Sequence, residues 1–332
     1  MTVQLEKTVA HSEQAASAKG CPIDHRTYSQ QKAALHPEAL DLPALEVDAK
    51  GVWHVRSFEA ARAILRAEET RQAGFKAELM DHVDSKMRRP VLYQEGEEHL
   101  RQRKLIARYF TPKTTSDKYR QMMEAYADSI LNELRQSKRA DLSRLSMTMA
   151  VKVASQVVGL TDSILPGLDR RINAFFAGGD MDLKWTPRSI FNLLRRQFTV
   201  MLFLYLDVKP SIRRRQQNPQ EDVISHLISQ KATLPEILTE CITYGAAGMA
   251  TTREFICIAA WHLLENPDLR AYYLSASEEK RQDLLQEILR LEPVVGNLTR
   301  RTTNEIVVKS EGKQYTIPAG ALLDIHIGTG WV

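Results

Sequence analysis

The sequence predicts a mostly α-helical protein with small β-sheets. Apolar residues recur at helical spacing through nearly all of residues 97–291, and prolines interrupt this pattern at intervals. Residues 51–56 and 305–327 instead alternate apolar and polar side chains with the two-residue period of strands. Because these strands lie on either side of the helical stretch, they are expected to build a small sheet from segments far apart in the chain.

The first residues are expected to lie outside the folded domain. Residues 1–20 are rich in Gln, Glu, Ala, Ser and Lys, a composition typical of a disordered arm. Residues 21–332 contain no repeat and no low-complexity linker, so they are expected to form a single domain. Near its start, the strand at 51–56 leads into a helix that Ser57 caps and that ends at Ala67.

The longest predicted helix covers residues 234–266. Thr233 and Glu236 have the spacing of a capping box, and Pro267 stops the helix. At ~1.5 Å per residue this helix is about 45 Å long, so it must cross the whole domain.

The chain changes character after this helix. A further helix is expected to begin at Ser275 or Ser277 and to end before Pro293. Residues 305–317 have the pattern of a β-hairpin, and residues 321–327 that of another strand.

Composition and cysteine usage exclude several classes of protein. The chain has 332 residues and a formal net charge of +4, with its basic residues scattered, so a nucleic-acid partner is not indicated. The most apolar run, residues 198–206, is far shorter than the ~20 residues that span a bilayer. Cys21, Cys241 and Cys257 include no CxxC pair, which argues against a disulfide framework or a cysteine zinc site. A cytoplasmic protein without a membrane partner is expected.

Residues 245–250, at the centre of the long helix, are unusually small. Gly245, Gly248 and the alanines around them remove side-chain bulk, so another group can approach the backbone closely. Thr251 can donate a hydrogen bond to the carbonyl of Ala247, which bends helices, so a local distortion is expected here. Either another helix packs closely against this small-residue patch, or a planar ligand lies across it.

Two charged pairs share helix faces elsewhere in the chain. His99 and Arg103 are four residues apart, and Glu287 and Arg290 are three residues apart. Taken singly, each pair is common on a solvated helix surface. Arg300 follows them, just ahead of the predicted hairpin.

In this order, the motifs resemble those of the cytochrome P-450 family of haem-thiolate monooxygenases, particularly its soluble bacterial branch. The resemblance covers nearly the whole chain, from Cys21 to Gly328. It implies a cytochrome P-450-like fold, a haem (iron) cofactor and insertion of one oxygen atom from O2 into a small apolar organic substrate. It also implies electrons from NAD(P)H, delivered by a ferredoxin-type redox partner that docks on a basic face.

The resemblance assigns roles on the long helix. Ala247, Gly248 and Thr251 match the oxygen-binding notch and are implied to be catalytic. The position before the threonine is usually acidic in the family, and here it is Ala250. Glu254, one turn onward, is either its substitute or a solvated helix glutamate.

The resemblance also assigns cofactor-binding and structural roles. His99, Arg103 and Arg300 match residues that hold the haem propionates, and a buried macrocycle with two carboxylates needs such cationic donors. Arg301 is an adjacent rival to Arg300. Glu287 and Arg290 match a buried structural pair that ties its helix to the loop beneath the haem.

The family's axial ligand has no counterpart here. The loop Phe-x-x-Gly-x-x-x-Cys is absent, so no metal ligand is assigned. The chain stops at residues 329–332, where the family continues, and we therefore expect a fold that is incomplete at the C-terminus through truncation or a frameshift. Two functions stay open: a haem monooxygenase, or an inactive truncated remnant with weak or no haem binding.

Overall fold

The computed structural model describes residues 42–74, 77, 89–176 and 187–327. The expected disordered arm at residues 1–20, and Cys21 with it, lie outside the described residues. Contacts divide the chain into Met1–Leu42 and Pro43–Val332, and every helix and strand below belongs to the second unit.

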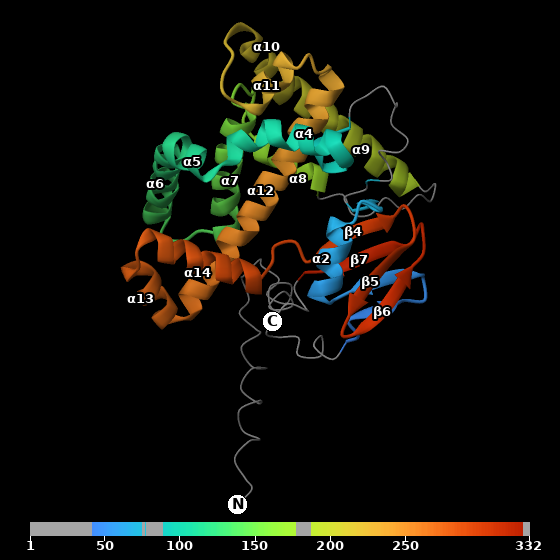
Figure 1. The fold of residues 1–332 in the computed structure, drawn as a ribbon. Coiled ribbons are helices and arrows are strands. Elements are labelled where there is room, and N and C mark those ends of the chain that lie inside the picture. Colours follow the sequence, from blue (N-terminus) through green and yellow to red (C-terminus); the bar gives the residue numbers. More distant parts are fainter. Residues whose placement is uncertain (1–41, 75–76, 78–88, 177–186, 328–332) are drawn as a thin grey trace, which may run out of the picture. The chain divides into compact units, whose positions relative to one another are not determined.

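The described chain is mostly helical, as the sequence predicts (Figure 1). Its α-helices are α2 (Phe58–Arg66), α4 (Gly96–Ala107), α5 (Pro112–Thr114), α6 (Arg120–Ser137), α7 (Leu142–Val158), α8 (Leu168–Phe176), α9 (Pro187–Phe203), α10 (Lys209–Gln217), α11 (Val223–Ser229), α12 (Leu234–Glu265), α13 (Pro267–Ser275) and α14 (Glu278–Leu291). Short 3-10 turns η3 (Val91–Tyr93) and η4 (Arg108–Phe110) flank α4, and π-helical turns η5 (Thr115–Tyr119) and η6 (Leu204–Val208) precede α6 and α10. None of the described helices combines the length and the apolar character that crossing a membrane requires.

The strands form one mixed sheet and one hairpin. Their bounds are β1 (Leu45–Val47), β2 (Val52–Val55), β3 (Thr70–Gln72), β4 (Asn297–Thr302), β5 (Ile306–Ser310), β6 (Lys313–Ile317) and β7 (Leu322–His326). The five-stranded sheet has the order β1-β2-β7-β4-β3, in which only β2 and β7 run parallel. The predicted pairing of segments far apart in the chain is confirmed, whereas β4, which carries Arg300, was not predicted.

The long helix has the predicted ends. At its start, Glu236 Oε2 accepts a hydrogen bond from the Thr233 N–H at 2.7 Å, which is half of a capping box. α12 is assigned as α-helix through residues 247–251, and the expected local distortion there stays a prediction. The hydrogen bond on which that prediction depends is present, because Thr251 Oγ1 donates to the Ala247 carbonyl at 2.5 Å.

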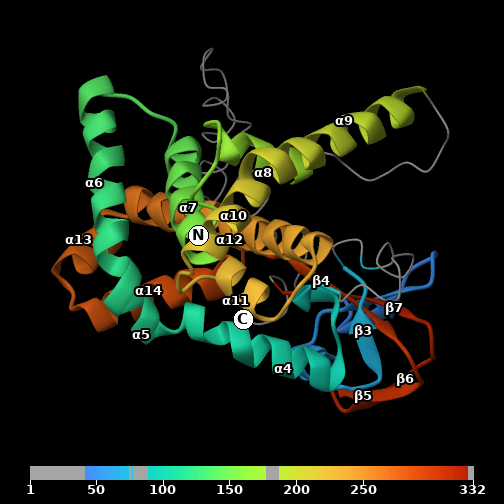
Figure 2. The same ribbon diagram turned by 90° about the horizontal axis from the view of Figure 1, so that it is seen from above.

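The small-residue patch of α12 packs against neighbouring helices. α7 lies alongside α12 in both views (Figures 1 and 2). A Cβ atom added at Gly248 would sit 3.5 Å from the Ala154 Cβ of α7, and one at Gly245 would sit 3.3 Å from Ile172 Cδ1 of α8. The reading of the glycines as a surface for close helix packing is therefore confirmed.

Buried apolar side chains form two clusters. The larger one fills the space among α7, α11 and α12 and includes Phe203, Leu227 and Met249, each at most 1% exposed. The smaller one lies between α2 and the strands, and alternate strand residues such as Leu323 and Ile325 point into it.

A buried ion-pair network joins the loop after α7 to α10 and α11. The Arg215 guanidinium donates to the Asp222 carboxylate, to Asp162 Oδ2 at 3.0 Å and to Thr161 Oγ1 at 2.8 Å. Asp222 Oδ1 also caps α11 by accepting the Ser225 N–H at 2.8 Å. Because the Asp222 side chain is only 3% exposed, its charge depends on this guanidinium.

Replacing Asp222 is expected to destabilise the fold strongly. An Asp222→Asn variant keeps the side-chain shape but leaves Arg215 buried with one carboxylate partner, Asp162. We expect a loss of about 3 kcal/mol in the free energy of unfolding, measured by urea denaturation. The neighbouring Glu221 is 87% exposed in its pair with Lys118, so Glu221→Gln should cost less than about 1 kcal/mol. Equal losses for the two variants would contradict a structural role of the network.

Candidate functional site

The face of α12 that carries Ala247 and Thr251, here the open face, is partly exposed and lies beside the packed glycines. Tyr244, Ala247 and Thr251 follow the i, i+3, i+7 spacing of a single helix face. Ala247 is exposed and Thr251 is partly exposed. At Gly248, the position that a Cβ atom would occupy faces α7. Of the three residues implied to be catalytic, Ala247 and Thr251 therefore lie on the open face, and Gly248 borders it where α12 contacts α7.

The segments that flank α4 contact this part of α12. Before α4, the Val91 N–H donates to Glu240 Oε1 at 3.1 Å. After α4, the Phe110 ring stacks on Tyr244 with 6.0 Å between ring centroids. Burial and then the Glu240 carboxylate raise the pKa of the Tyr244 hydroxyl, and the Arg103 guanidinium opposes this rise.

Arg300 reaches the first turn of α4. Its Nη1 atom lies 3.6 Å from Oε1 of Glu95, the residue that precedes α4. The same Glu95 oxygen accepts the Gln72 N–H at 2.6 Å, and Gln72 is the sheet partner of Arg300. Arg301 Nη1 instead donates to the Gly320 carbonyl at 2.9 Å, as expected for neighbours on opposite faces of a strand. The structure thus favours Arg300 over Arg301 as a partner for ligands near α4.

These contacts bring together the elements that carry His99, Arg103 and Arg300. His99 lies one turn after Glu95, and its N–H donates to the Glu95 carbonyl at 3.5 Å. His99 and Arg300 are partly buried, while Arg103 is exposed. That all three side chains line one wall stays a prediction.

The donor set fits the carboxylates of a haem. Two guanidinium groups and an imidazole suit anionic oxygen atoms, and planar guanidinium groups bind carboxylates with two parallel hydrogen bonds. Arg300 already lies beside a carboxylate, that of Glu95, in this structure. His99, Arg103 and Arg300 are therefore suited to hold propionates.

The described cysteines do not fit the role of an axial ligand. Cys241 is fully buried in the helical core, and this burial raises the pKa of its thiol far above the ordinary value. Cys257 Sγ donates to Ser146 Oγ at 3.8 Å, and burial raises the pKa of this thiol as well. A ligand cysteine must be a thiolate, so both residues are better explained as core side chains.

The pair on α14 forms, but it is not buried. Arg290 Nε and Nη2 donate to the two carboxylate oxygens of Glu287 at 2.8 and 2.7 Å, and these bonds lower the pKa of Glu287. The two side chains are 47% and 51% exposed, so the implied burial is wrong in the described residues. Exposure to water screens the charges, which leaves the pair little stabilising energy.

The acid considered as a proton donor is engaged with its neighbour. Arg253 Nη2 donates to Glu254 Oε1, and both side chains are partly buried. Glu254 is therefore held beside Arg253 on α12 and is not simply a solvated helix glutamate.

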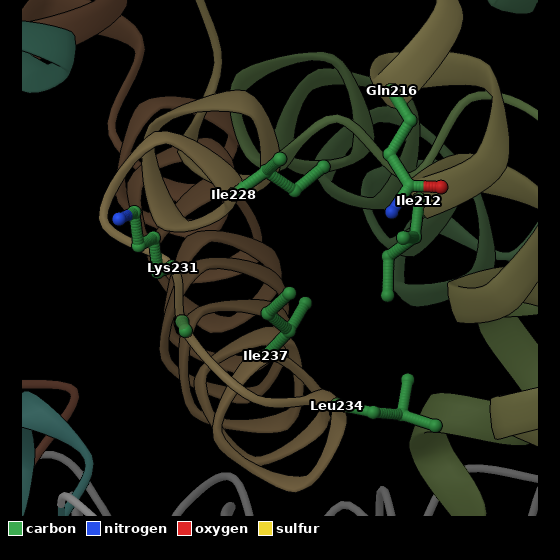
Figure 3. Close-up of a pocket in the computed structure, with 7 residues that line it drawn as sticks. Ile212, Gln216, Ile228, Lys231, Leu234 and Ile237 are labelled. Carbon is green, nitrogen blue, oxygen red and sulfur yellow. The ribbon is translucent and has the colours of Figure 1, made fainter.

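A separate hollow of about 300 Å³ lies at the start of α12 (Figure 3). Its lining comes from α10, α11, the loop after α11 and α12: Ile212, Gln216, Ile228, Lys231, Ala232, Leu234 and Ile237. At ~1.5 Å per residue, Ile237 lies ~21 Å from Thr251 along the helix. The hollow therefore does not belong to the candidate site.

Comparison with protein families gives one match over most of the chain. The family model described as Cytochrome P450 matches residues 30–273.

Individual relatives and solved structures agree with that match. The chain is 24% identical to the biotin biosynthesis cytochrome P450 of Bacillus subtilis (strain 168), over 81% of this chain and 69% of the relative. It is 28% identical to nocardicin C N-oxygenase of Nocardia uniformis subsp. tsuyamanensis, over 82% of this chain and 70% of the relative. The crystal structure of P450BioI with an acyl carrier protein is similar with a TM-score of 0.65 and 21% identity, over 92% of this chain and 77% of that one.

Proposed function

The chain belongs to the cytochrome P450 family of haem monooxygenases. On that premise we propose that it contains the residues that bind haem and O2 for the oxidation of a small apolar substrate. The observation that carries this proposal is the junction of α4, α12 and β4. There Arg300 Nη1 lies 3.6 Å from the Glu95 carboxylate at the start of α4, and the Phe110 ring, just after α4, stacks on Tyr244 of α12.

Each residue of the site has a definite task in this proposal. Bound haem supplies the activation of O2 and the transfer of one oxygen atom. His99, Arg103 and Arg300 hold its propionates. The small Ala247 side chain lets a ligand come close to the α12 backbone. Gly248 lets α7 pack closely against α12 and so helps to position this helix. The Thr251 hydroxyl donates its hydrogen bond to the Ala247 carbonyl. The lone pairs of Thr251 Oγ1 can therefore accept a hydrogen bond from a ligand at the open face.

Proton delivery differs from the family pattern at one position. Ala250 has no proton to give, so the nearest acid along α12 is Glu254. We assign Glu254 this supporting role, with the Arg253 guanidinium orienting its carboxyl group through a hydrogen bond.

The proposed substrate class follows from apolar surface and from one structural neighbour. α9 and η6 expose a row of large apolar side chains at helical spacing: Phe191, Leu194, Phe198, Met201 and Tyr205. In the P450BioI structure, the bound molecule is hexadec-9Z-enoic acid carried by an acyl carrier protein. An apolar substrate suits this row of side chains.

Electrons are proposed to come from NAD(P)H through an acidic, ferredoxin-type protein in the cytoplasm. Residues 101–120 hold seven basic side chains and one acid, Asp117: the basic ones are Arg101, Arg103, Lys104, Arg108, Lys113, Lys118 and Arg120. Most of these are exposed around α4, so they offer a basic face to such a partner.

A second candidate function is haem binding without turnover. It is favoured by the burial of Cys241 and the hydrogen bond of Cys257 to Ser146, which leave no accessible thiolate among the described residues. Haem would then be held by the propionate partners and by a ligand other than these thiols.

Haem affinity is expected to depend on Arg300 and not on Arg301. Loss of a charge-assisted hydrogen bond costs about 1.5–3 kcal/mol, so Arg300→Ala should weaken haem binding by roughly 10–100-fold. The measurement is a haem titration followed by Soret absorbance and tryptophan quenching. Arg301→Ala, whose side chain contacts the Gly320 carbonyl, should stay within about threefold of the unmodified chain. Equal losses for the two variants, or no haem binding by the unmodified chain, would refute the proposed propionate site.

Neither buried cysteine is expected to ligate the iron. A Cys241→Ala/Cys257→Ala double variant should keep the haem affinity and the spectrum of the 332-residue chain, because both thiols are held protonated in the core. The reduced, carbon monoxide-treated spectra of both proteins should lack a thiolate-type Soret band. A thiolate band that the double variant loses would show that one of these cysteines reaches the iron.

Ferredoxin binding is expected to depend on the basic face. Lys104→Glu should weaken binding about tenfold at low ionic strength, measured by calorimetry, and the effect should shrink as salt is added. Lys313→Glu, an equal charge reversal on strand β6, is the matched control and should change the affinity little. A comparable loss for Lys313→Glu would mean that net charge, and not this face, governs binding.

A further inference from the structure

Three side chains with metal-ligand chemistry meet on the five-stranded sheet. His54 lies on β2, and Asp324 and His326 lie on β7. His54 Nδ1 is 3.1 Å from His326 Nε2 and 3.4 Å from Asp324 Oδ2, and His326 Nε2 is 3.4 Å from the same carboxylate oxygen. All three side chains are between 21% and 23% exposed, so a small ion can reach them from solvent.

Strand pairing explains why these residues meet. β2 and β7 are parallel with His54 directly opposite Asp324, and His326 follows two residues later on the same face. The next residue on each strand, Val55 after His54 and Ile325 after Asp324, is fully buried on the other face. The cluster therefore occupies the polar face of the sheet and takes no part in the apolar core.

Outer hydrogen-bond partners orient two of the three ligands. Asn297 Nδ2 donates to Asp324 Oδ1 at 2.7 Å, which turns Oδ2 toward the histidines. Asp48 Oδ2 lies 3.5 Å from His54 Nε2, so a proton on Nε2 leaves Nδ1 with a free lone pair. Carboxylate–histidine pairs of this kind orient metal-bound imidazoles and raise their basicity.

We propose that His54, Asp324 and His326 bind one divalent transition-metal ion, with zinc as the best match. Ligand atoms ~2.0–2.1 Å from a tetrahedral zinc ion are ~3.3–3.4 Å apart, close to the three separations found here. Octahedral magnesium would bring its ligand atoms to ~2.9 Å from one another and prefers oxygen donors. Three protein ligands leave the fourth tetrahedral position for water.

The competing explanation is a hydrogen bond between the two histidines. At 3.1 Å, a proton on His326 Nε2 can bridge to His54 Nδ1 without any metal. Arg56, just after β2, also places positive charge near this cluster, although Glu46 Oε1 accepts a hydrogen bond from its guanidinium at 2.7 Å. The two explanations differ in whether the chain takes up an equivalent of metal at this cluster.

The test is zinc binding by the full chain without added haem. Zn²⁺ is titrated in competition with a chromophoric chelator, and Co²⁺ is used in parallel because its visible spectrum reports tetrahedral geometry. His326→Gln removes one ligand, and Asp324→Asn removes the charge while keeping the shape and the Asn297 contact. His262→Gln is the control, because His262 lies 3.5 Å from a single carboxylate, that of Glu292, and belongs to no such cluster.

We expect the unmodified chain and His262→Gln to bind one equivalent of zinc. His326→Gln and Asp324→Asn should bind no zinc at this cluster, or bind it at least about tenfold more weakly. Cobalt should give an intense tetrahedral spectrum only in the first two proteins. Circular dichroism checks that each variant is folded. The proposal is overturned if the unmodified chain takes no zinc from the chelator, or if His326→Gln and Asp324→Asn bind zinc as the unmodified chain does.

Discussion

The close contact between α12 and α7 sets the positions of the other helices. The distance between two packed helices depends on the side chains at their contact, and here a glycine meets an alanine, Gly248 against Ala154. One turn earlier, Gly245 makes the corresponding close contact with Ile172 of α8. An added Cβ atom would make an ordinary contact 3.5 Å from Ala154 at Gly248, whereas at Gly245 it would press against Ile172 Cδ1 at 3.3 Å. The small residues of α12 therefore allow α7 and α8 to pack closely against it.

α4 connects this helical core to the sheet. Its flanking segments contact α12 through Val91 and Phe110, and Glu95 at its start lies beside Arg300 on β4. The segments that flank α4 thus contact both α12 and the sheet. This arrangement brings the elements that carry His99, Arg103 and Arg300 near one another, although these elements are far apart in the sequence.

Local signals predicted much of the fold, and long-range pairing decided what they missed. The ends of α12 follow from Glu236 and Pro267, which act on residues beside them in the chain. β4 carries two consecutive arginines and no apolar alternation, so only its partners β3 and β7 reveal it as a strand. The choice between Arg300 and Arg301 likewise depends on which face of that strand meets α4. The His54 cluster was missed because its signal is the parallel pairing of β2 with β7.

The same parallel pairing has a consequence for the order of folding. His54 and His326 are separated by 272 residues, so β2 can pair with β1 early but cannot pair with β7 until the residues between them have left the ribosome. At roughly 5–20 residues per second, that delay is about 15–50 s. During this time β2 presents unpaired backbone groups and the apolar side chains of Trp53 and Val55, a template for pairing with other chains. Non-local pairing also slows folding itself, which lengthens the time for which this edge of β2 is exposed.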